Sequence, residues 1–408
     1  MICLTSFRVN AGEPNISASS KVYNVVEYGA DNSGKKSSDS GVAAALAAAK
    51  NDIRKNMLDG KKNAVIYFPA GTYKLSTSVK LFEKMNLAAD PKATIKFSGT
   101  RGIIMYNLSS CYITGGTWSG NNKTVLIGGT GIKNISIKDL KITSGHTGIQ
   151  YYSSTVSVKN VSVSNCKSIG MNFSKKTTAT VSNCKVNKNG SGYPKKGYFG
   201  QGMSVFENSS AKVYNIQLND NRECGLNLNA GKLVIENCQM YRNGRHGLDT
   251  SNVCNVTMKN CDLYKNGFKD HLDGMILKDG STGKIINCKF RSNAASGLLI
   301  NHAKTNAFVQ GCTFSGNVYH NIYSENLKSG TVKMTIKNCK FYKCKKSYSL
   351  MINTYGKSEY KLTVSGNKHS KLDYRYVYVI NNKWRFGDIL PPHKSPILKW
   401  GLLTQCLF

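Results

Sequence analysis

Apolar and polar residues alternate along most of this chain in short runs, and one pattern returns between Val161 and Asn338. The clearest copies lie between Asn237 and Asn301. Each has an Asn-Cys pair, an Asn five residues after the Cys, and a Gly that opens an apolar–polar alternation. Alternation with a period of two predicts β-strands, because successive side chains of a strand point to opposite faces. The copies recur every ~22 to 32 residues, which is typical of a solenoid.

Three columns define the repeat. The cysteine column holds Cys166, Cys184, Ile216, Cys238, Cys261, Cys288, Cys312 and Cys339. The asparagine column holds Asn189, Asn221, Asn243, Asn266, Asn293 and Asn317. The glycine column holds Gly170, Gly202, Gly225, Gly247, Gly274 and Gly297.

No copy contains twelve residues with helical spacing, which disfavours leucine-rich, ankyrin and helical repeats. Short strands joined by Asn/Gly turns, one coil per copy, predict a single-stranded parallel β-helix, an all-β solenoid. Repeated residues then stack about 4.8 Å apart. We expect the asparagines to hydrogen-bond to one another and to adopt the left-handed turn conformation. We expect the cysteines to be buried as small apolar groups, because no pair of them has zinc-ligand spacing.

The remainder of the chain predicts one helix and further strands. The helix covers residues 40–57, with Asp39 or Ser40 as its N-cap. Strands are expected at residues 64–68, 93–97, 103–106 and 135–142, and further strands are expected to continue through residues 348–364 and 374–381.

The entry segment resembles a known superfamily. Tyr28-Gly29-Ala30-Asp31, an Ala-rich helix, and Val65-Ile66-Tyr67-Phe68-Pro69-Ala70-Gly71-Thr72-Tyr73 are similar to the start of pectin-lyase-like proteins. The resemblance implies a right-handed parallel β-helix whose first coil is capped by the N-terminal helix. Such a cap covers strand edges and apolar core that an open solenoid end would expose. The superfamily includes polysaccharide lyases, glycoside hydrolases, epimerases and phage tailspikes.

We therefore divide the chain into three parts. Residues 1–21 are a signal remnant or flexible N-terminus, because residues 1–11 form a short apolar run that ends in small residues. Residues 22–382 form the β-helix with its cap, and residues 383–408 form a C-terminal tail or cap. The sequence contains no run of eighteen apolar residues, so it predicts no transmembrane helix. We expect a secreted or cell-surface monomer.

The net charge of the chain indicates what kind of partner it binds. The chain has 56 Lys and Arg against 22 Asp and Glu, a formal net charge of +34. So large an excess predicts an anionic partner. The alternative is a solvated, repulsive surface with no specific partner. Nucleic acid is the weaker choice of partner, because the sequence contains no recognised nucleic-acid module.

Strand parity predicts which side chains reach solvent. The first and third residues after each repeat Gly are apolar and should face inward. The second and fourth should face outward and form a polar strip on adjacent strands. The second positions are Ser204, Asn227, Asp249, Ile276, Leu299 and Tyr323. The fourth positions are Phe206, Asn229, Ser251, Lys278, Asn301 and Glu325.

Two insertions fall just before this strip, at residues 191–199 and 268–272. They should form walls beside it, with aromatic rings for sugar stacking and lysines for anionic groups. The alternative is that both are merely tolerated. The residues expected to bind substrate are Asn227, Asn229, Asn301, Tyr193, Lys195, Lys196 and Tyr198.

Chemically useful side chains gather in two consecutive coils, namely Arg245, His246, Asp249, His271, Asp273 and Lys278. Proton abstraction at C5 of a uronate needs a cation beside the carboxylate, a base for the proton and an acid near O4. We take Asp249, Lys278, Arg245, His271 and His246 as catalytic candidates, with Tyr323 as a candidate acid. The alternatives are that Asp249 and Lys278 form a surface ion pair, and that His246 and Asp273 are structural.

The same coils resemble the catalytic module of mannuronan C5-epimerases. That family has a Gly-aromatic-Asp-Pro-His motif followed by a coil that ends Asp-Gly-Phe-x-x-Asp. In this chain the corresponding residues are Gly247-Leu248-Asp249-Thr250-Ser251 and Asp273-Gly274-Met275-Ile276-Leu277-Lys278. Asp249 matches the motif Asp, Thr250-Ser251 replaces Pro-His, and Lys278 replaces the final Asp.

These observations favour an enzyme that acts on an anionic, uronate-containing polysaccharide as a lyase or C5-epimerase. Two alternatives stay open, a non-catalytic polysaccharide-binding adhesin and a hydrolase of the polygalacturonase type. Of the motifs of such hydrolases, the sequence has no Asp-Asp pair, only His246-Gly247 of Gly-His-Gly, and no Arg-x-Lys in a usable place. No metal site is asserted, although Ca²⁺ bound by Asp249, Asp270 or Asp273 could bridge substrate carboxylates.

Overall fold

The computed structural model describes residues 16–191, 200–326, 329–345, 349–354, 358–369 and 377–380. These belong to two compact units, unit 1 (Met1–Ser204) and unit 2 (Val205–Phe408). Strand β20 (Met203–Phe206) contains the boundary between the units. The proposed leader at residues 1–11 and the tail at 383–408 lie outside the described residues. No helix among the described residues is both long and apolar enough to cross a membrane.

Unit 1 contains three parallel sheets. Sheet A has the order β1 (Ser20–Asn24), β3 (Asn63–Phe68), β6 (Met85–Ala89), β9 (Cys111–Thr114), β12 (Ile135–Lys138), β15 (Thr155–Lys159) and β18 (Thr178–Ser182). Sheet B has the order β2 (Ser33–Ser37), β4 (Gly71–Leu75), β7 (Ala93–Phe97), β10 (Thr117–Ser119), β13 (Lys141–Thr143), β16 (Ser162–Ser164) and β19 (Lys185–Asn187). Sheet C has the order β5 (Val79–Lys80), β8 (Arg101–Tyr106), β11 (Val125–Thr130), β14 (Thr147–Tyr152) and β17 (Met171–Ser174).

Unit 2 repeats the plan. Its sheet A has the order β21 (Ser210–Tyr214), β24 (Lys232–Glu236), β27 (Asn255–Lys259), β30 (Thr282–Ile286), β33 (Asn306–Gln310), β36 (Gly330–Lys337) and β39 (Ser358–Ser365). Its sheet B has the order β22 (Gln217–Asn219), β25 (Gln239–Tyr241), β28 (Asp262–Tyr264), β31 (Lys289–Arg291), β34 (Thr313–Ser315), β37 (Lys340–Phe341) and β40 (Lys368–His369). Its sheet C has the order β23 (Leu226–Asn229), β26 (Leu248–Ser251), β29 (Met275–Lys278), β32 (Leu298–Asn301), β35 (Ile322–Asn326), β38 (Leu350–Thr354) and β41 (Val377–Ile380).

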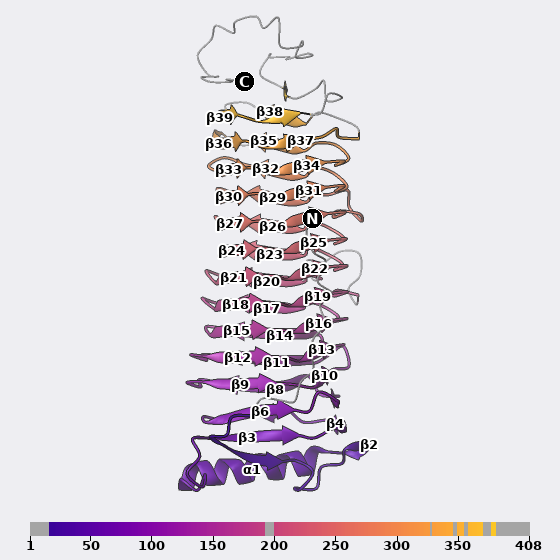
Figure 1. The fold of residues 1–408 in the computed structure, drawn as a ribbon, viewed down its shortest axis with the longest axis vertical. Helices are drawn as coiled ribbons and strands as arrows, with labels where there is room; N and C mark the ends of the chain where they lie inside the picture. Colours follow the sequence, from indigo (N-terminus) through magenta and orange to yellow (C-terminus); the bar gives the residue numbers. More distant parts are fainter. Residues whose placement is uncertain are drawn as a thin grey trace, which may run out of the picture. The chain divides into compact units, whose positions relative to one another are not determined.

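Each coil contributes one strand to every sheet, and within each unit the strands stack coil on coil (Figure 1). The described strand pairs are parallel, for example β24 with β27 and β25 with β28. The predicted all-β solenoid of parallel coils is therefore confirmed. One predicted strand is wrong: residues 135–142 form β12 and β13, which belong to different sheets. Asp139 lies between them with φ 55°, so the chain turns where continuous alternation had suggested one strand.

The predicted N-terminal helix is α1 (Asp39–Lys55), which packs against β1 and β3 at the end of unit 1 (Figure 1). Its buried face is made of small and aliphatic residues, Gly41, Val42, Ala45 and Ala49. Ser38, not Asp39 or Ser40, occupies the N-cap position and forms no side-chain cap bond. Asp39 instead accepts hydrogen bonds from the backbone and hydroxyl groups of Ser76 and Thr77. Burial alone would raise the pKa of Asp39, but these hydrogen bonds hold it well below its usual value.

The turns of unit 2 follow the asparagine column. Asn221, Asn243, Asn266 and Asn293 are fully buried, and the side-chain amide of each donates to the next asparagine of the column, at 3.0–3.2 Å. The predicted asparagine ladder is therefore correct. The predicted left-handed conformation of this column is wrong. The residue before each ladder asparagine makes the turn instead, as at Arg242 (φ 51°), which leaves the amide inside the coil.

A second left-handed position precedes the cysteine column. It is filled by Asn237, Asn260 and Asn287, with φ of 53–56°. Short polar side chains such as Asn tolerate this conformation as single residues. The cysteines that follow are buried and unpaired by disulfides, as are all cysteines among the described residues. The predicted interior position of the column is confirmed.

Candidate functional site

The predicted strip lies on sheet C of unit 2. The first and third residues of its strands, such as Leu248 and Leu277, are fully buried, as strand parity predicted. Asn227 is paired in register with Asp249, and Asp249 with Ile276. Leu299 and Tyr323 continue the same column. Lys278, Asn301 and Glu325 continue the fourth-position column.

The strip is less open than parity suggested. Asp249 is 8% exposed and Ile276 is 6% exposed, so two side chains of the second column are buried. Lys278 belongs to the neighbouring fourth-position column, and its ammonium group reaches Asp249.

Several oxygens on the strip have no hydrogen-bond partner among the described residues. They are Oδ1 of Asn227, Oδ1 of Asp249 and Oδ1 of Asn301, each of which is buried. Asn172 Oδ1 and Ser204 Oγ, at second positions in unit 1, are also buried and also lack a hydrogen-bond partner among the described residues. Buried acceptors of this kind normally have a partner, from the protein, from water or from a ligand. Asn229, by contrast, accepts a hydrogen bond from Asn252.

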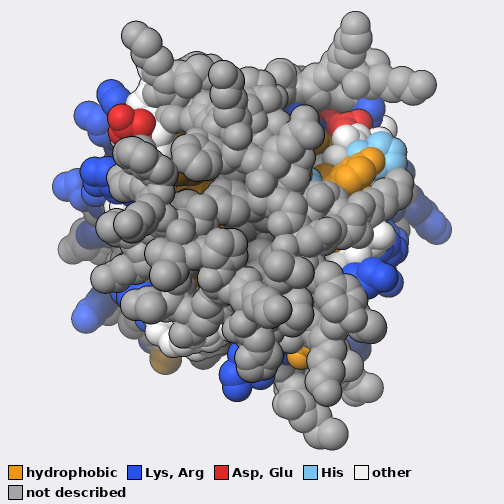
Figure 2. Space-filling model, turned by 90° about the horizontal axis from the view of Figure 1, so that it is seen from above, with side chains coloured by type: hydrophobic (Ala, Val, Ile, Leu, Met, Phe, Trp, Pro, Cys, Tyr) orange, Lys and Arg blue, Asp and Glu red, His pale blue; other side chains and the backbone are white. Residues whose placement is uncertain are grey.

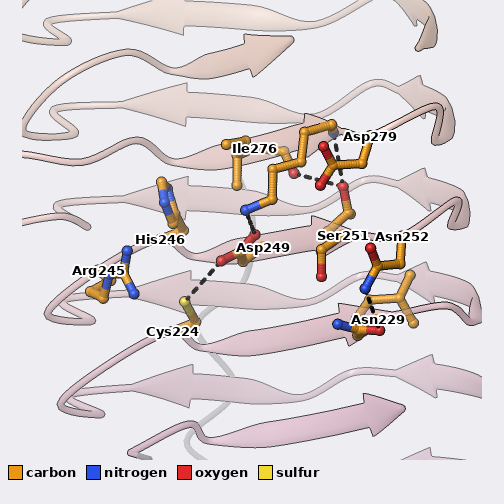
Figure 3. A network of polar contacts seen from close by, with 12 residues as sticks. Cys224, Asn229, Arg245, His246, Asp249, Ser251, Asn252, Ile276 and Asp279 are labelled. Atoms are coloured by element: carbon orange, nitrogen blue, oxygen red, sulfur yellow. Dashed lines mark hydrogen bonds and ion pairs between the residues drawn. The ribbon is translucent and has the colours of Figure 1, made fainter. Parts of the chain in front are cut away.

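Asp249 and Lys278 are in contact. Lys278 Nζ lies 3.1 Å from Asp249 Oδ1, and both side chains are mostly buried. The contact is an ion pair without the alignment of a hydrogen bond, since Asp249 Oδ1 has none. On the other side of the carboxylate, the Cys224 thiol lies 4.0 Å from Oδ2 (Figure 3). Burial raises the pKa of this thiol, so it remains protonated at neutral pH.

Arg245 lies beside this pair in a ring of acidic groups. Its Nη1 is 3.5 Å from Glu223 Oε2, and its Nε is 3.7 Å from Asp270 Oδ2. Burial alone would lower the pKa of Arg245, but the neighbouring Cys224, Glu223, Asp249 and Asp270 raise it. Burial raises the pKa of Glu223, against the effect of Arg245.

His246 and Asp273 lie behind the strip and are almost fully buried. His246 Nδ1 accepts a hydrogen bond from the Asp273 backbone at 3.3 Å, and Asp273 Oδ1 accepts one from the Ser296 backbone at 2.8 Å. Burial lowers the pKa of His246 to about 4 and raises the pKa of Asp273 to about 7. Both groups therefore favour their neutral forms, which is typical of polar groups that hold a turn.

The other candidates are more distant. His271 is exposed, with φ 52°, in the loop before β29. Tyr323 lies three strands from Asp249, about 14 Å along the sheet, so the structure does not bring it to the pair. Tyr323 instead packs against His320, with ring centroids 5.2 Å apart, and accepts a hydrogen bond from Asn353. Tyr193, Lys195, Lys196 and Tyr198 lie outside the described residues.

The sequence did not predict one polar pair that the structure contains. Asp279 and His302 follow the fourth-position residues Lys278 and Asn301, and Asp279 Oδ1 is hydrogen-bonded to His302 Nδ1. Both side chains are partly exposed. In the sequence, these two residues occupy the fifth position after the repeat Gly, directly after the strip. The contact between them appears only when two coils are stacked. Glu223 was missed in the same way.

A metal centre is not preformed here. Among the described residues, no group of three or more His, Cys, Asp or Glu side chains is arranged to hold an ion. Asp249 is paired with Lys278, Asp270 with Arg245, and Asp273 accepts a backbone hydrogen bond. Calcium therefore stays a prediction.

Sheet B carries an aromatic column that could be mistaken for a sugar platform. The rings of Tyr241 and Tyr264 stack on each other, 4.7 Å apart and 6° from parallel. The guanidinium of Arg242 lies over Tyr241, and that of Arg291 lies over Tyr264. Because a sugar would stack on a ring face, and these faces contact protein, the column is better explained as packing between coils.

Comparison with known proteins identifies the fold. A family model described as a right handed beta helix region matches residues 46–194, 124–272 and 266–383. Among curated protein sequences, none matches this chain.

Solved structures with similar folds have varied functions. The surface adhesin PfbA of Streptococcus pneumoniae is 15% identical, with a TM-score of 0.54 over 88% of this chain and 93% of the adhesin. The A-module of mannuronan C-5 epimerase AlgE4 from Azotobacter vinelandii is 14% identical, with a TM-score of 0.50 over 88% of this chain and all of the module. The catalytic unit of a GH87 α-1,3-glucanase from Streptomyces thermodiastaticus is 11% identical, with a TM-score of 0.58 over 91% of this chain and 69% of that unit.

At these identities the likenesses show the fold alone. The predicted right-handed parallel β-helix is nevertheless confirmed, because the family model covers most of the sequence. The chain belongs to the right-handed β-helix family.

Proposed function

We propose that this protein binds a uronate-containing polysaccharide along sheet C of unit 2 and abstracts the proton at C5, as a lyase or C5-epimerase does. The observation that carries the proposal is a set of buried acceptor oxygens on the strip. Asn227 Oδ1 and Asn301 Oδ1 lack hydrogen-bond partners among the described residues, and Asp249 Oδ1 contacts the Lys278 ammonium without the alignment of a hydrogen bond. Sugar hydroxyls are donors that could satisfy such acceptors. The ion pair of Asp249 with Lys278 supplies opposite charges at the same place.

In the proposed reaction, Lys278 exchanges Asp249 for the substrate carboxylate, and Arg245 contributes further positive charge. The Asp249 carboxylate then accepts the proton from C5, and the electron pair moves into the substrate carboxylate. In a lyase the C4–O4 bond breaks, a C4–C5 double bond forms, and the departing O4 takes a proton from water. In an epimerase a proton returns to C5 from the opposite face of the ring.

Hydrolysis is less well supported. Glycoside hydrolysis uses two carboxyl groups about 5 to 10 Å apart. The second- and fourth-position columns of unit 2 offer Asp249 and Glu325, which stand three strands apart, at least about 14 Å along the sheet.

The test is an activity screen on pectate, alginate and glycosaminoglycans, with and without a calcium chelator. A lyase product absorbs in the ultraviolet as an unsaturated uronide, and an epimerase changes C5 stereochemistry, which NMR detects. We expect Asp249→Asn and Lys278→Gln each to lower turnover by about a hundredfold or more. Lys96→Gln is the matched control, because Lys96 is an exposed lysine on sheet B of unit 1. No product from any polymer would contradict the proposal.

The second candidate is a binding protein without catalysis, secreted or held at the cell surface. It is favoured by the closed contact between Asp249 and Lys278, which already neutralises the two charged groups. This candidate predicts retention on anionic polymers that falls steeply with salt and survives Asp249→Ala combined with Lys278→Ala.

A further inference from the structure

The outer face of sheet A in unit 2 carries more basic than acidic side chains and lies away from the strip. Along the strip, the charged side chains at the second and fourth positions are Asp249, Lys278 and Glu325. On the outer face of sheet A, two glutamates, Glu236 and Glu359, stand against seven lysines. The lysines are Lys212, Lys232, Lys259, Lys284, Lys333, Lys337 and Lys361.

These lysines have no local counter-charges in contact. None of the seven forms an ion pair with a described residue. Lys212 and Lys232 lie on adjacent strands, as do Lys259 and Lys284, and Lys333 is paired in register with Lys361. Lys333 and Lys361 are about 5 Å apart across the strands, and the other two pairs are offset by two residues, so they are about 8 Å apart. These separations are no larger than the Debye length of about 8 Å at physiological salt, so the potentials within each pair overlap. Glu236 is paired in register with Lys259 and offsets part of its charge.

The lysines are interleaved with apolar side chains. The central column of the face runs in register from Lys212 through Val234, Thr257 and Lys284 to Phe308. Val234 is 38% exposed and Phe308 is partly exposed. Apolar groups between cations suit a polymer whose rings have C–H faces and whose carboxylates recur along the chain. In unit 1, the corresponding column contains Ser136, Ser157 and Thr180, which carry no charge.

We infer that the outer face of sheet A in unit 2 is a docking surface for an anionic polysaccharide, separate from the strip on sheet C. The charges on the polymer are carboxylates, and this face holds it by overlapping positive potential rather than by shaped pockets. Lys and Arg side chains project around the periphery of the molecule when it is seen from above (Figure 2). The proposed docking surface is limited to the sheet A face of unit 2. The inference does not depend on catalysis by the strip.

The experiment compares two variants of the full chain with equal net charge. One carries Lys212→Gln, Lys232→Gln, Lys259→Gln and Lys284→Gln on the proposed face. The matched control carries Lys92→Gln, Lys96→Gln, Lys123→Gln and Lys141→Gln, all exposed residues of unit 1. Binding to polygalacturonate and to heparin is measured over a range of salt concentrations, with dextran as the neutral polymer. Circular dichroism and thermal melting verify that both variants fold.

We expect the sheet A variant to bind about tenfold more weakly at low salt and to show a shallower dependence on salt. The control variant should stay within about threefold of the wild type. Equal losses in both variants, or binding to dextran, would overturn the inference. So would displacement by single-stranded DNA at a lower concentration than by polygalacturonate, because it would point to nucleic acid instead. Heparin binding without polygalacturonate binding would also overturn the inference, because it would show that this face recognises sulfates and not carboxylates.

Discussion

At the scale of single residues, the ladder asparagines show how one side chain serves two coils. Asn266 Oδ1 accepts the backbone N–H and the side-chain amide of Asn243, while its own amide donates to Met240 O and to Asn293 Oδ1. All of these groups are buried, so each contact replaces a water that the site excludes.

Asn266→Ala should therefore lower the free energy of unfolding by about 2 to 4 kcal/mol, because it leaves a buried donor of Asn243 without its acceptor. Urea denaturation measures the change. Asn255→Ala is the control, since Asn255 is exposed on sheet A and its loss should cost less than about 0.5 kcal/mol. Equal effects at both positions would show that the ladder adds nothing beyond ordinary surface contacts.

The burial of His246 should make the free energy of unfolding depend on pH. In the unfolded chain its pKa is near 6.5, and burial lowers it to about 4 in the fold, with Asp249 acting against this shift. Between these values the unfolded chain binds more protons, so stability from neutral His246 is present above pH 6.5 and is lost as pH falls toward 4. Asp273 acts in the opposite direction, because its raised pKa adds stability at low pH that is lost as pH rises toward 7.

Comparison with His246→Asn isolates the histidine, because the amide oxygen can still accept the Asp273 N–H. The variant should gain about 2 to 3 kcal/mol relative to the wild type between pH 7 and pH 4. Thermal melts across this range measure it, with His271→Asn as the exposed control. Parallel curves for wild type and His246→Asn would show that His246 is not shielded from protons.

At the scale of elements, the docking of α1 depends on one close approach. A Cβ added to Gly41 would lie 2.1 Å from Ala30 N and 2.5 Å from Gly29 C, both backbone atoms. The helix can therefore cover the first coil only if this position has no side chain.

Gly41→Ala should destabilise unit 1 by about 2 kcal/mol or more, through steric conflict. Helix propensity alone predicts the opposite, a gain of about 1 kcal/mol. The sign of the change in denaturation midpoint decides between these effects. Ala44→Ser, on the exposed side of α1, should change stability by no more than about 0.5 kcal/mol.

Strand prediction also belongs to this scale. Residues 93–97 match β7 without error, because alternation there is bounded by turn residues on both sides. Residues 135–142 were joined into one strand because Asp139-Leu140 continues the alternation, although the chain changes sheets there. Periodicity records which residues face inward, but it does not record the corner at which a coil passes from one sheet to the next.

At the scale of the whole molecule, the interior is built partly from thiols. All eleven described cysteines are buried and none forms a disulfide, although the sequence contains 13. Burial raises the pKa of several of them, including Cys111 and Cys166, which suppresses the reactive thiolate.

A thiol reagent should therefore label none of these eleven positions rapidly in the native protein and all of them in denaturant. Peptide mapping after brief labelling measures this. Dithiothreitol should leave the melting temperature unchanged, because no disulfide among these cysteines stabilises the fold. Rapid native labelling at any cysteine of the interior column would contradict the packing described above.

The sequence by itself determined the coil, the inward and outward faces and the buried columns of Cys, Asn and Gly, because these depend on a short period repeated in each copy. Only the tertiary structure decided which side chains meet across coils. The contact of Asp249 with Lys278, the acidic ring around Arg245, the Asp279–His302 pair and the burial of His246 all join residues from successive coils. Their geometry depends on register between coils, on turns and on rotamers, which a linear pattern does not encode.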